Sequence, residues 1–248
     1  SARYVLTEPF AYDSLRGASG LPTLTGVLTI EGQGAVLTRD STLSCEPAQA
    51  FRIGYLAPEA QMRLYDLTLQ YGCGQRGGAF YVDAGAVLQA ERVVFRQNWA
   101  DQGAAVYNRG TLHLLEAQII QNRASYGSAI YNDEATVQIQ QSWFASNEDN
   151  ALYNKSGNVF VEASTFEDNE GFDGGALYNA QGVAKLQQVV FRHNDARFSG
   201  GAIYNSGGIL EVIQSEFEDN ASEYSGGAIK NLGGALTLQA CTFRNNDS

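Results

Sequence analysis

The chain has 248 residues, 44% of them hydrophobic, and a formal net charge of −11 at pH 7. Nucleic-acid binding depends on Lys and Arg side chains that neutralise phosphates, so this balance argues against a nucleic-acid partner and disfavours polyanionic substrates. A membrane-spanning helix needs about 18 or more consecutive apolar residues, and the sequence contains no such run. We therefore expect no direct insertion of this segment into a membrane.

Residues 1–73 are less regular than the rest of the chain, and we expect them to form an N-terminal cap and irregular first coils. Residues 4–7 predict a strand that caps the open end of a core. Glycine turns and alternating apolar residues predict early coil strands in residues 21–38 and 62–72. Residues 40–60 predict an irregular loop between them.

The three cysteines are too few for a disulfide scaffold and include no Cys-x-x-Cys pair. A structural zinc site is not expected, because only two histidines accompany them. Cys45 and Cys73 could form one bridge near the N-terminal end, or both could remain free. Cys241 falls in a column of small residues and is expected to be a buried thiol.

From residue 74 onward two short phrases alternate. One is Gly-Gly-Ala-aliphatic-Tyr-Asn or a close variant, and the other is Phe-x-x-Asn, in which Ile119 once replaces Phe. The asparagines of the second phrase recur at intervals of 24, 25, 22, 25, 26 and 26 residues, at Asn98, Asn122, Asn147, Asn169, Asn194, Asn220 and Asn246. A repeat of this length is typical of a solenoid, in which neighbouring units complete a common core.

Between the phrases, apolar residues alternate with polar ones, which indicates strands with one face inward. We therefore predict an all-β fold over residues 1–248: a right-handed, single-stranded parallel β-helix with about 25 residues and three short strands per coil. In such a stack, equivalent residues of successive coils lie about 4.8 Å apart. The Phe residues should then form an inward aromatic stack, and the two Asn columns should form hydrogen-bonded ladders at bends.

The alternating phrases resemble the repeats of the polymorphic outer-membrane protein family, over residues 74–248. Residues 1–73 more weakly resemble the N-terminal part of bacterial surface proteins with pectate-lyase-like β-helices. This resemblance implies an extracellular or outer-membrane-associated location and a non-enzymatic role as an adhesin or passenger module that contacts glycans or a host protein. Because no cap is evident at the C-terminal end, we expect the chain to be part of a longer protein.

Two aromatic columns are the candidate ligand-binding residues. One consists of Tyr residues beside the inward aliphatic position: Tyr107, Tyr131, Tyr153, Tyr178 and Tyr204. The other precedes the Gly-Gly turn: Tyr126, Phe172, Phe198 and Tyr224. Exposed aromatic rings could serve as a platform for sugar rings or a protein partner. The alternative is that the rings only stack on one another and stabilise the solenoid.

Charged columns follow the Phe residues. Glu167, Arg192, Glu218 and Arg244 alternate in sign, so each Arg should lie between carboxylates and fix the register. The next column, Asp168, His193 and Asp219, places a histidine between two carboxylates. This column is either a general acid/base or weak metal site, or a solvated ladder without chemistry.

Clusters of acidic residues raise the possibility of Ca²⁺, which prefers oxygen ligands. They lie at residues 148–150, at residues 167–170 with Asp173, and at residues 216–219, and none has an EF-hand or nonapeptide pattern. We otherwise expect no cofactor. The competing function is a polysaccharide lyase or glycoside hydrolase, although the sequence offers no recognisable set of catalytic residues.

Overall fold

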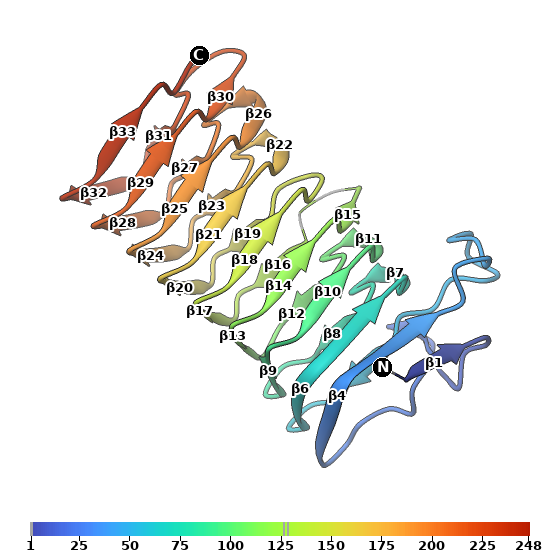
Figure 1. Ribbon diagram of the computed structural model, residues 1–248. Coiled ribbons are helices and arrows are strands. Elements are labelled where there is room, and N and C mark those ends of the chain that lie inside the picture. Colours follow the sequence, from blue (N-terminus) through green and yellow to red (C-terminus); the bar gives the residue numbers. More distant parts are fainter. Residues whose placement is uncertain (1, 126, 128) are drawn as a thin grey trace.

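The computed structural model describes residues 2–125, 127 and 129–248, and it confirms the parallel β-helix (Figure 1). The described residues form strands and no helix. Strands from about 7 coils, about 26 residues apart, stack in parallel sheets. A 17-stranded sheet, here the large sheet, and an 8-stranded sheet, here the tyrosine sheet, run along the solenoid. Two three-stranded sheets, here the corner sheets, lie at a third side of it.

The large sheet receives two strands from each regular coil, separated by a bend. Its N-terminal strands are β1 (Arg3–Leu6), β4 (Val27–Arg39) and β6 (Gln61–Gln70). The first segments are β9 (Val87–Glu91), β13 (Thr111–Leu115), β17 (Thr136–Gln140), β20 (Asn158–Glu162), β24 (Val183–Gln187), β28 (Ile209–Ile213) and β32 (Ala235–Gln239). The second segments are β10 (Val94–Arg96), β14 (Gln118–Ile120), β18 (Trp143–Ala145), β21 (Thr165–Glu167), β25 (Val190–Arg192), β29 (Glu216–Glu218) and β33 (Thr242–Arg244).

The remaining strands close each coil. The tyrosine sheet contains β5 (Gly54–Leu56), β8 (Phe80–Val82), β12 (Val106–Asn108), β16 (Ile130–Asp133), β19 (Leu152–Lys155), β23 (Leu177–Ala180), β27 (Ile203–Ser206) and β31 (Ile229–Leu232). The corner sheets are β7 (Cys73–Arg76), β11 (Trp99–Gln102) and β15 (Arg123–Ala124), and β22 (Glu170–Asp173), β26 (Asp195–Ser199) and β30 (Ala221–Ser222). An antiparallel hairpin joins β2 (Ala11–Asp13) and β3 (Gly17–Ser19) near the N-terminus.

The predicted Phe column lies in one row inside the solenoid. Phe144, Phe166, Phe191 and Phe217 are at most 1% exposed. Neighbouring rings in the series from Phe144 to Phe243 stack with centroids 4.5, 5.3, 4.8 and 4.8 Å apart. Aliphatic residues of the tyrosine sheet and the first segments complete this core. Each coil therefore buries its apolar residues against one another and against the coils above and below it.

Both Asn columns form continuous ladders of side-chain amides. In the first ladder, each Nδ2 donates to Oδ1 of the next Asn at 2.8–3.1 Å, from Asn98 to Asn246. In the second ladder the same bond spans 2.6–2.8 Å, from Asn108 to Asn231. Most of these amides are 0% exposed. Their mutual bonds satisfy buried polar groups that would otherwise destabilise the fold.

The bends need left-handed backbone at residues other than glycine. The residue before each Asn of the first ladder, such as Asp168, His193 and Asp219, has φ between 50° and 55°. The bend between the two segments of the large sheet also has a left-handed residue, and a small residue follows it. Ser164 is one of these, and its hydroxyl accepts a hydrogen bond from Ser142 N–H at 3.0 Å. Cys241 occupies the same column but is only partly buried.

The N-terminal region differs from the prediction at one point. Gly54–Leu56 lies inside the predicted irregular loop but forms β5, the first strand of the tyrosine sheet. Its three residues pair in parallel with Phe80–Val82, and this partner, rather than any local pattern, defines it as a strand. The predicted capping strand is present as β1, which pairs in parallel with β4. Leu6, at its end, packs against the core.

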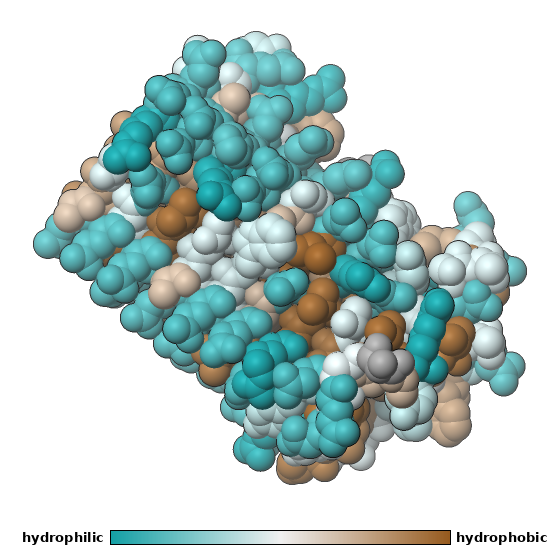
Figure 2. Space-filling view, viewed as in Figure 1, coloured by the Kyte–Doolittle hydropathy of each residue, from teal (hydrophilic) through white to brown (hydrophobic). Residues whose placement is uncertain are grey.

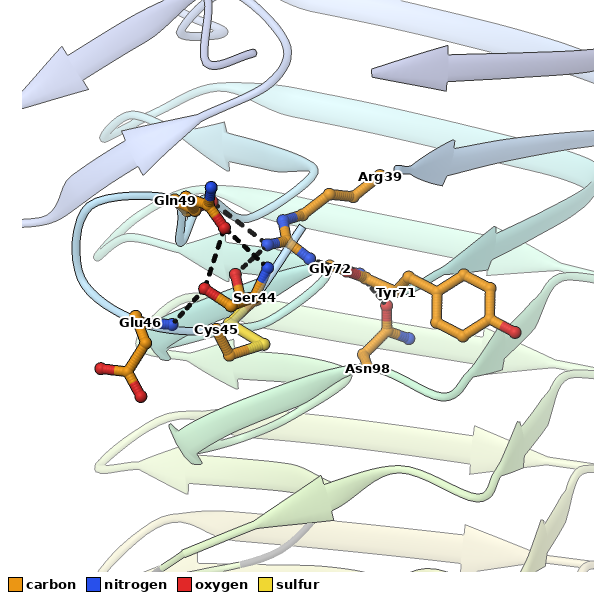
Figure 3. The surroundings of a disulfide bond; sticks show 9 residues. Arg39, Ser44, Cys45, Glu46, Gln49, Tyr71, Gly72 and Asn98 are labelled. Atoms are coloured by element: carbon orange, nitrogen blue, oxygen red, sulfur yellow. Dashed lines mark hydrogen bonds between the residues drawn. A yellow bond between two sulfur atoms is a disulfide. The ribbon is translucent and has the colours of Figure 1, made fainter. Parts of the chain in front are cut away.

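A disulfide between Cys45 and Cys73 ties the 40–53 loop to the first corner sheet (Figure 3). Beside it lies Arg39, which is 2% exposed. Its guanidinium donates to the carbonyl oxygens of Tyr71 at 3.4 Å, Gln49 at 3.1 Å and Ser44. Main-chain carbonyls, rather than a carboxylate, thus receive the hydrogen bonds of this buried cation.

Candidate functional site

The most distinctive surface feature lies at the one coil that is shorter than its neighbours. Three residues, 148–150, separate the first-ladder Asn147 from Ala151, whereas six residues separate the equivalent pair in the next coil, Asn169 and Ala176. The short coil lacks both the Gly-Gly turn and a corner strand. Within residues 2–125, 127 and 129–248, the strand pairing between the two corner sheets is reduced to isolated bridges from Glu148 to Arg123 and Glu170. The solenoid surface is therefore interrupted between β15 and β22 (Figure 1).

Two side chains at the interruption replace the missing main chain. Asp149 Oδ2 accepts a hydrogen bond from Gly127 N–H at 2.5 Å. Asn150 Nδ2 donates to the carbonyl oxygens of Asp173 at 2.7 Å and Gly174 at 2.5 Å. Both Asp149 and Asn150 have φ of 68°, which is uncommon for residues with a side chain. Left-handed residues also occur at the regular bends of this solenoid, so here they show that surrounding contacts enforce the backbone.

The deletion leaves two adjoining hollows of about 250 and 510 Å³. We call them together the notch. Ser125, Asp149 and Phe172 line both hollows. The smaller one is also lined by Gln102, Gly127, Tyr131, Asn150, Tyr153, Asp173 and Tyr178. The larger one is also lined by Trp99, Arg123, Ala124, Glu148, Glu170, Gly171 and Arg197. The notch thus combines aromatic rings, carboxylates and guanidinium groups.

Two carboxyl groups in the smaller hollow are poorly solvated. Burial raises the pKa of Asp149 above its ordinary value, although the hydrogen bond from Gly127 partly opposes this. Burial also raises the pKa of Asp173, against a hydrogen bond from Ser199 N–H. Removing a carboxylate from water favours its protonated form. These two groups therefore keep a proton to higher pH than solvated aspartates.

The Tyr column forms a continuous stack outside the main core. Ring centroids from Tyr81 to Tyr204 are 4.8–5.3 Å apart. Tyr107 is 3% exposed and Tyr131 is 8% exposed, whereas Tyr153, Tyr178 and Tyr204 are half-buried. Because each ring face contacts the next ring, a ligand can reach only ring edges and hydroxyl groups here. Of the five predicted rings, the notch includes Tyr131, Tyr153 and Tyr178.

The second aromatic column is more accessible. Phe172, Phe198 and Tyr224 are 51%, 42% and 69% exposed. Their ring centroids are 6.1 and 5.7 Å apart, and the Arg197 guanidinium carbon lies 5.8 and 5.9 Å from the first two rings. Phe172 contributes to the notch, while Tyr126, also predicted here, lies outside the described residues.

A charged network lies beside the Tyr stack. Asp83 is 2% exposed, and its carboxylate lies 2.6 Å from an Arg16 nitrogen. Asp133 accepts hydrogen bonds from Tyr107 Oη at 2.7 Å and from Lys155 Nζ at 2.9 Å. Burial alone would raise the pKa of Asp133, but these two donors lower it below the ordinary value. The pairing gives these carboxylates a structural role along the tyrosine sheet.

His193 lies between two carboxylates, as the sequence predicted. Its Nδ1 is 3.7 Å from Asp168 Oδ1, and its Nε2 is 3.6 Å from Asp219 Oδ2. These separations exceed hydrogen-bond length, and all three side chains are at least 40% exposed. No hollow of the candidate sites includes them. The arrangement supports the solvated ladder rather than acid/base chemistry.

The alternating charged column lies on β21, β25, β29 and β33, at the front of Figure 1 and Figure 2. Each arginine of this column forms an ion pair with one glutamate rather than with two. Arg192 Nε lies 2.9 Å from Glu167 Oε1. Arg244 pairs with Glu216 at 3.0 Å instead of Glu218, the residue expected from the column. Strand pairing does place Arg192 between Glu167 and Glu218. The strand register is as predicted, but a long flexible side chain can reach more than one partner in that register. The register alone therefore did not determine the ion pairs.

Among residues 2–125, 127 and 129–248, no group of three or more His, Cys, Asp or Glu side chains is arranged to hold a metal ion. The acidic clusters considered for Ca²⁺ therefore do not converge in the part that the structure describes. The same described ranges include no helix long and apolar enough to cross a bilayer.

The sequence identified several parts of the notch but not their association. The 22-residue interval was the available signal, because a short coil must omit surface segments. Trp99, Arg123 and Arg197 were missed, since each belongs to a different coil and has no distinctive spacing. No protein-family model matches the chain, and no curated protein matches it in sequence.

Proposed function

We propose that this chain is a non-enzymatic extracellular or cell-surface β-helix module that binds a short glycan segment in the notch. An adhesin or passenger role, of the kind implied by its resemblance to polymorphic outer-membrane protein repeats, fits this proposal. The observation that carries it is the short coil, which opens a hollow beside aromatic edges and polar groups. Concave sites with a few converging polar groups are the usual form of ligand sites.

The lining favours a neutral sugar. Phe172 offers an accessible apolar ring, and Asp149, Asp173 and the tyrosine hydroxyls offer hydrogen-bonding groups. Four carboxylates and two guanidinium groups line the notch, so an acidic sugar would meet net repulsion. Arg123 is already paired with Glu148 at 3.0 Å.

A glycoside hydrolase is the second candidate, because Asp149 and Asp173 occupy one hollow. A carboxyl group with a raised pKa is suited to protonate a leaving oxygen. However, Asp149 already accepts the Gly127 N–H and substitutes for missing main chain. We therefore favour binding over hydrolysis.

A glycan array, followed by incubation of the bound glycans with the protein, tests this function. We expect binding without new reducing ends or unsaturated products. Phe172→Ala should weaken binding about fivefold or more, because it removes an accessible ring from the notch. Tyr224→Ala is the matched control, since this exposed ring of the same column lies outside the notch.

A second variant closes the notch. Replacing residues 148–150 by the six residues 170–175 would restore the length found in the next coil. Binding should disappear while the circular dichroism spectrum is retained. Product formation would establish the hydrolase or lyase instead, and equal binding by the Phe172→Ala and Tyr224→Ala proteins would place the ligand elsewhere.

A further inference from the structure

A separate depression runs over the outer face of the large sheet. Two hollows of about 400 and 210 Å³ adjoin there, and Gln138 and Gln140 line both. We call them the trough. It is lined in addition by Leu64, Tyr65, Gln89, Ala90, Glu91, His113, Leu114, Leu115, Ile139, Phe160, Val161, Glu162, Lys185, Leu186, Gln187, Glu211 and Ile213.

The repeat explains the shape of the trough. Along each first-segment strand, the middle and last outward residues belong to two different columns. In β17 these are Gln138 and Gln140, and strand pairing aligns them with Phe160 and Glu162 of β20. Two parallel rows of side chains thus flank a floor of main chain. From β6 to β28 the rows extend over six strand steps of about 4.8 Å, or roughly 29 Å.

The walls present groups that recognise sugars. Gln138 and Gln187 are exposed and form no side-chain hydrogen bond within the described residues, so their amides can both donate and accept. Phe160, 38% exposed, supplies an apolar ring surface between them. Stacking on such rings combined with hydrogen bonds to hydroxyl groups is a suitable way to hold a pyranose ring.

The charges restrict the ligand further. Glu91, Glu162 and Glu211 line the trough, and Lys185 is its only Lys or Arg among the lining residues. Lys185 Nζ already lies 3.4 Å from Glu211 Oε2. A polymer of acidic sugars would therefore be repelled, whereas a neutral polymer would not.

We propose that the trough binds an unbranched neutral polysaccharide laid along the solenoid axis. Each coil presents its own pair of outward side chains, and each pair from β9 to β28 includes at least one polar group. Successive sugar units therefore meet a new hydrogen-bonding group at each step. This site is distinct from the notch, because no residue lines both. The two sites also differ in the ligand they suit, an extended chain in one and a short segment in the other.

Isothermal titration of the full chain with neutral β-linked gluco- and manno-oligosaccharides, from disaccharide to octasaccharide, tests the proposal. Affinity should increase with length until the chain fills the trough. Phe160→Ala should weaken hexasaccharide binding about fivefold to tenfold, and Gln138→Ala should weaken it less. Gln118→Ala is the control, because this exposed glutamine lies on β14 outside the trough.

The outcomes separate this site from the notch. Loss of hexasaccharide binding in Phe160→Ala but not in Phe172→Ala supports the trough, whatever the array shows for the notch. Three results would overturn it: no heat with either neutral series, affinity that does not change with length, or equal binding of acidic galacturonan oligosaccharides.

Discussion

Removing one amide from the first Asn ladder should destabilise the protein more than any surface substitution in the same coil. Asn169 Nδ2 donates to Phe144 O at 3.0 Å and to Asn194 Oδ1 at 3.0 Å. Its Oδ1 accepts from Asn147 N–H at 3.1 Å and from Asn147 Nδ2 at 2.9 Å. All four residues are 0% exposed, so water does not replace these partners in the intact ladder.

The expected magnitude follows from these four bonds. At about 1 kcal/mol each, their loss in Asn169→Ala lowers the free energy of unfolding by about 4 kcal/mol. Asn169→Asp should be at least as harmful at neutral pH, since a carboxylate cannot donate and would face Phe144 O and Asn194 Oδ1. Asn158→Ala is the control, because this exposed asparagine lies on β20 in the same region. We expect it to change stability by less than about 0.5 kcal/mol.

Urea denaturation followed by far-UV circular dichroism measures the difference. A solenoid need not unfold in a single step, so amide hydrogen exchange should accompany it. Protection should fall first at Asn147 N–H and in the adjoining coils. If the free energies of unfolding of the Asn169→Ala and Asn158→Ala proteins differ by less than about 1 kcal/mol, the ladder does not stabilise the fold as we argue.

Three further predictions concern other parts of the molecule. Lys230 follows Tyr204 in the stack, so Lys230→Tyr should extend it and raise stability by about 0.5–1.5 kcal/mol in thermal unfolding; an unchanged melting temperature would contradict this. Cys45 and Cys73 are 28 residues apart, so their replacement by Ser should cost about 3–4 kcal/mol by the chain-entropy relation; a melting temperature insensitive to both replacement and reductant would refute it. Because the folded state raises the pKa of Asp149, it binds the proton more tightly than the unfolded state, and stability falls as pH rises above the ordinary carboxyl pKa. Asp149→Asn should remove this dependence. If the melting temperatures of the two proteins change with pH in the same way between pH 4 and 8, the assignment is wrong.

The sequence predicted the interior of the solenoid well because identical positions recur. Phe166, Phe191 and Phe217 share one environment, so a single spacing locates all of them. The surface was less predictable. Tyr107 was correctly separated from the main core, yet it is buried by its neighbours and by Arg76, whose guanidinium carbon lies 5.4 Å from its ring centroid.

The repeat pattern did not predict features that occur in a single coil. The strand Gly54–Leu56 exists because it pairs with β8, and nothing in its three residues marks it. The notch arises because one coil is short. Its Tyr131, Tyr153, Tyr178 and Phe172 belong to columns of the repeat, but the repeat does not predict that residues of at least four coils line one hollow. A repeat predicts what neighbouring coils have in common, whereas a binding site depends on what one coil does differently.

The buried ladders also limit where this protein can be produced. Asn154-Lys-Ser, Asn220-Ala-Ser and Asn246-Asp-Ser are acceptor sequences for N-linked glycosylation, and all three asparagines belong to the ladders. Asn154 and Asn220 are 0% exposed, and Asn154 Nδ2 donates to Asn179 Oδ1 and Gly157 O. An oligosaccharide transferred to Asn154 Nδ2 in a eukaryotic secretory pathway would replace one of its two donated hydrogens, and it would not fit inside the buried Asn ladder. Expression in such a host therefore requires Ser156→Ala, Ser222→Ala and Ser248→Ala. The second change also removes a buried hydroxyl that has no hydrogen-bond partner among the described residues.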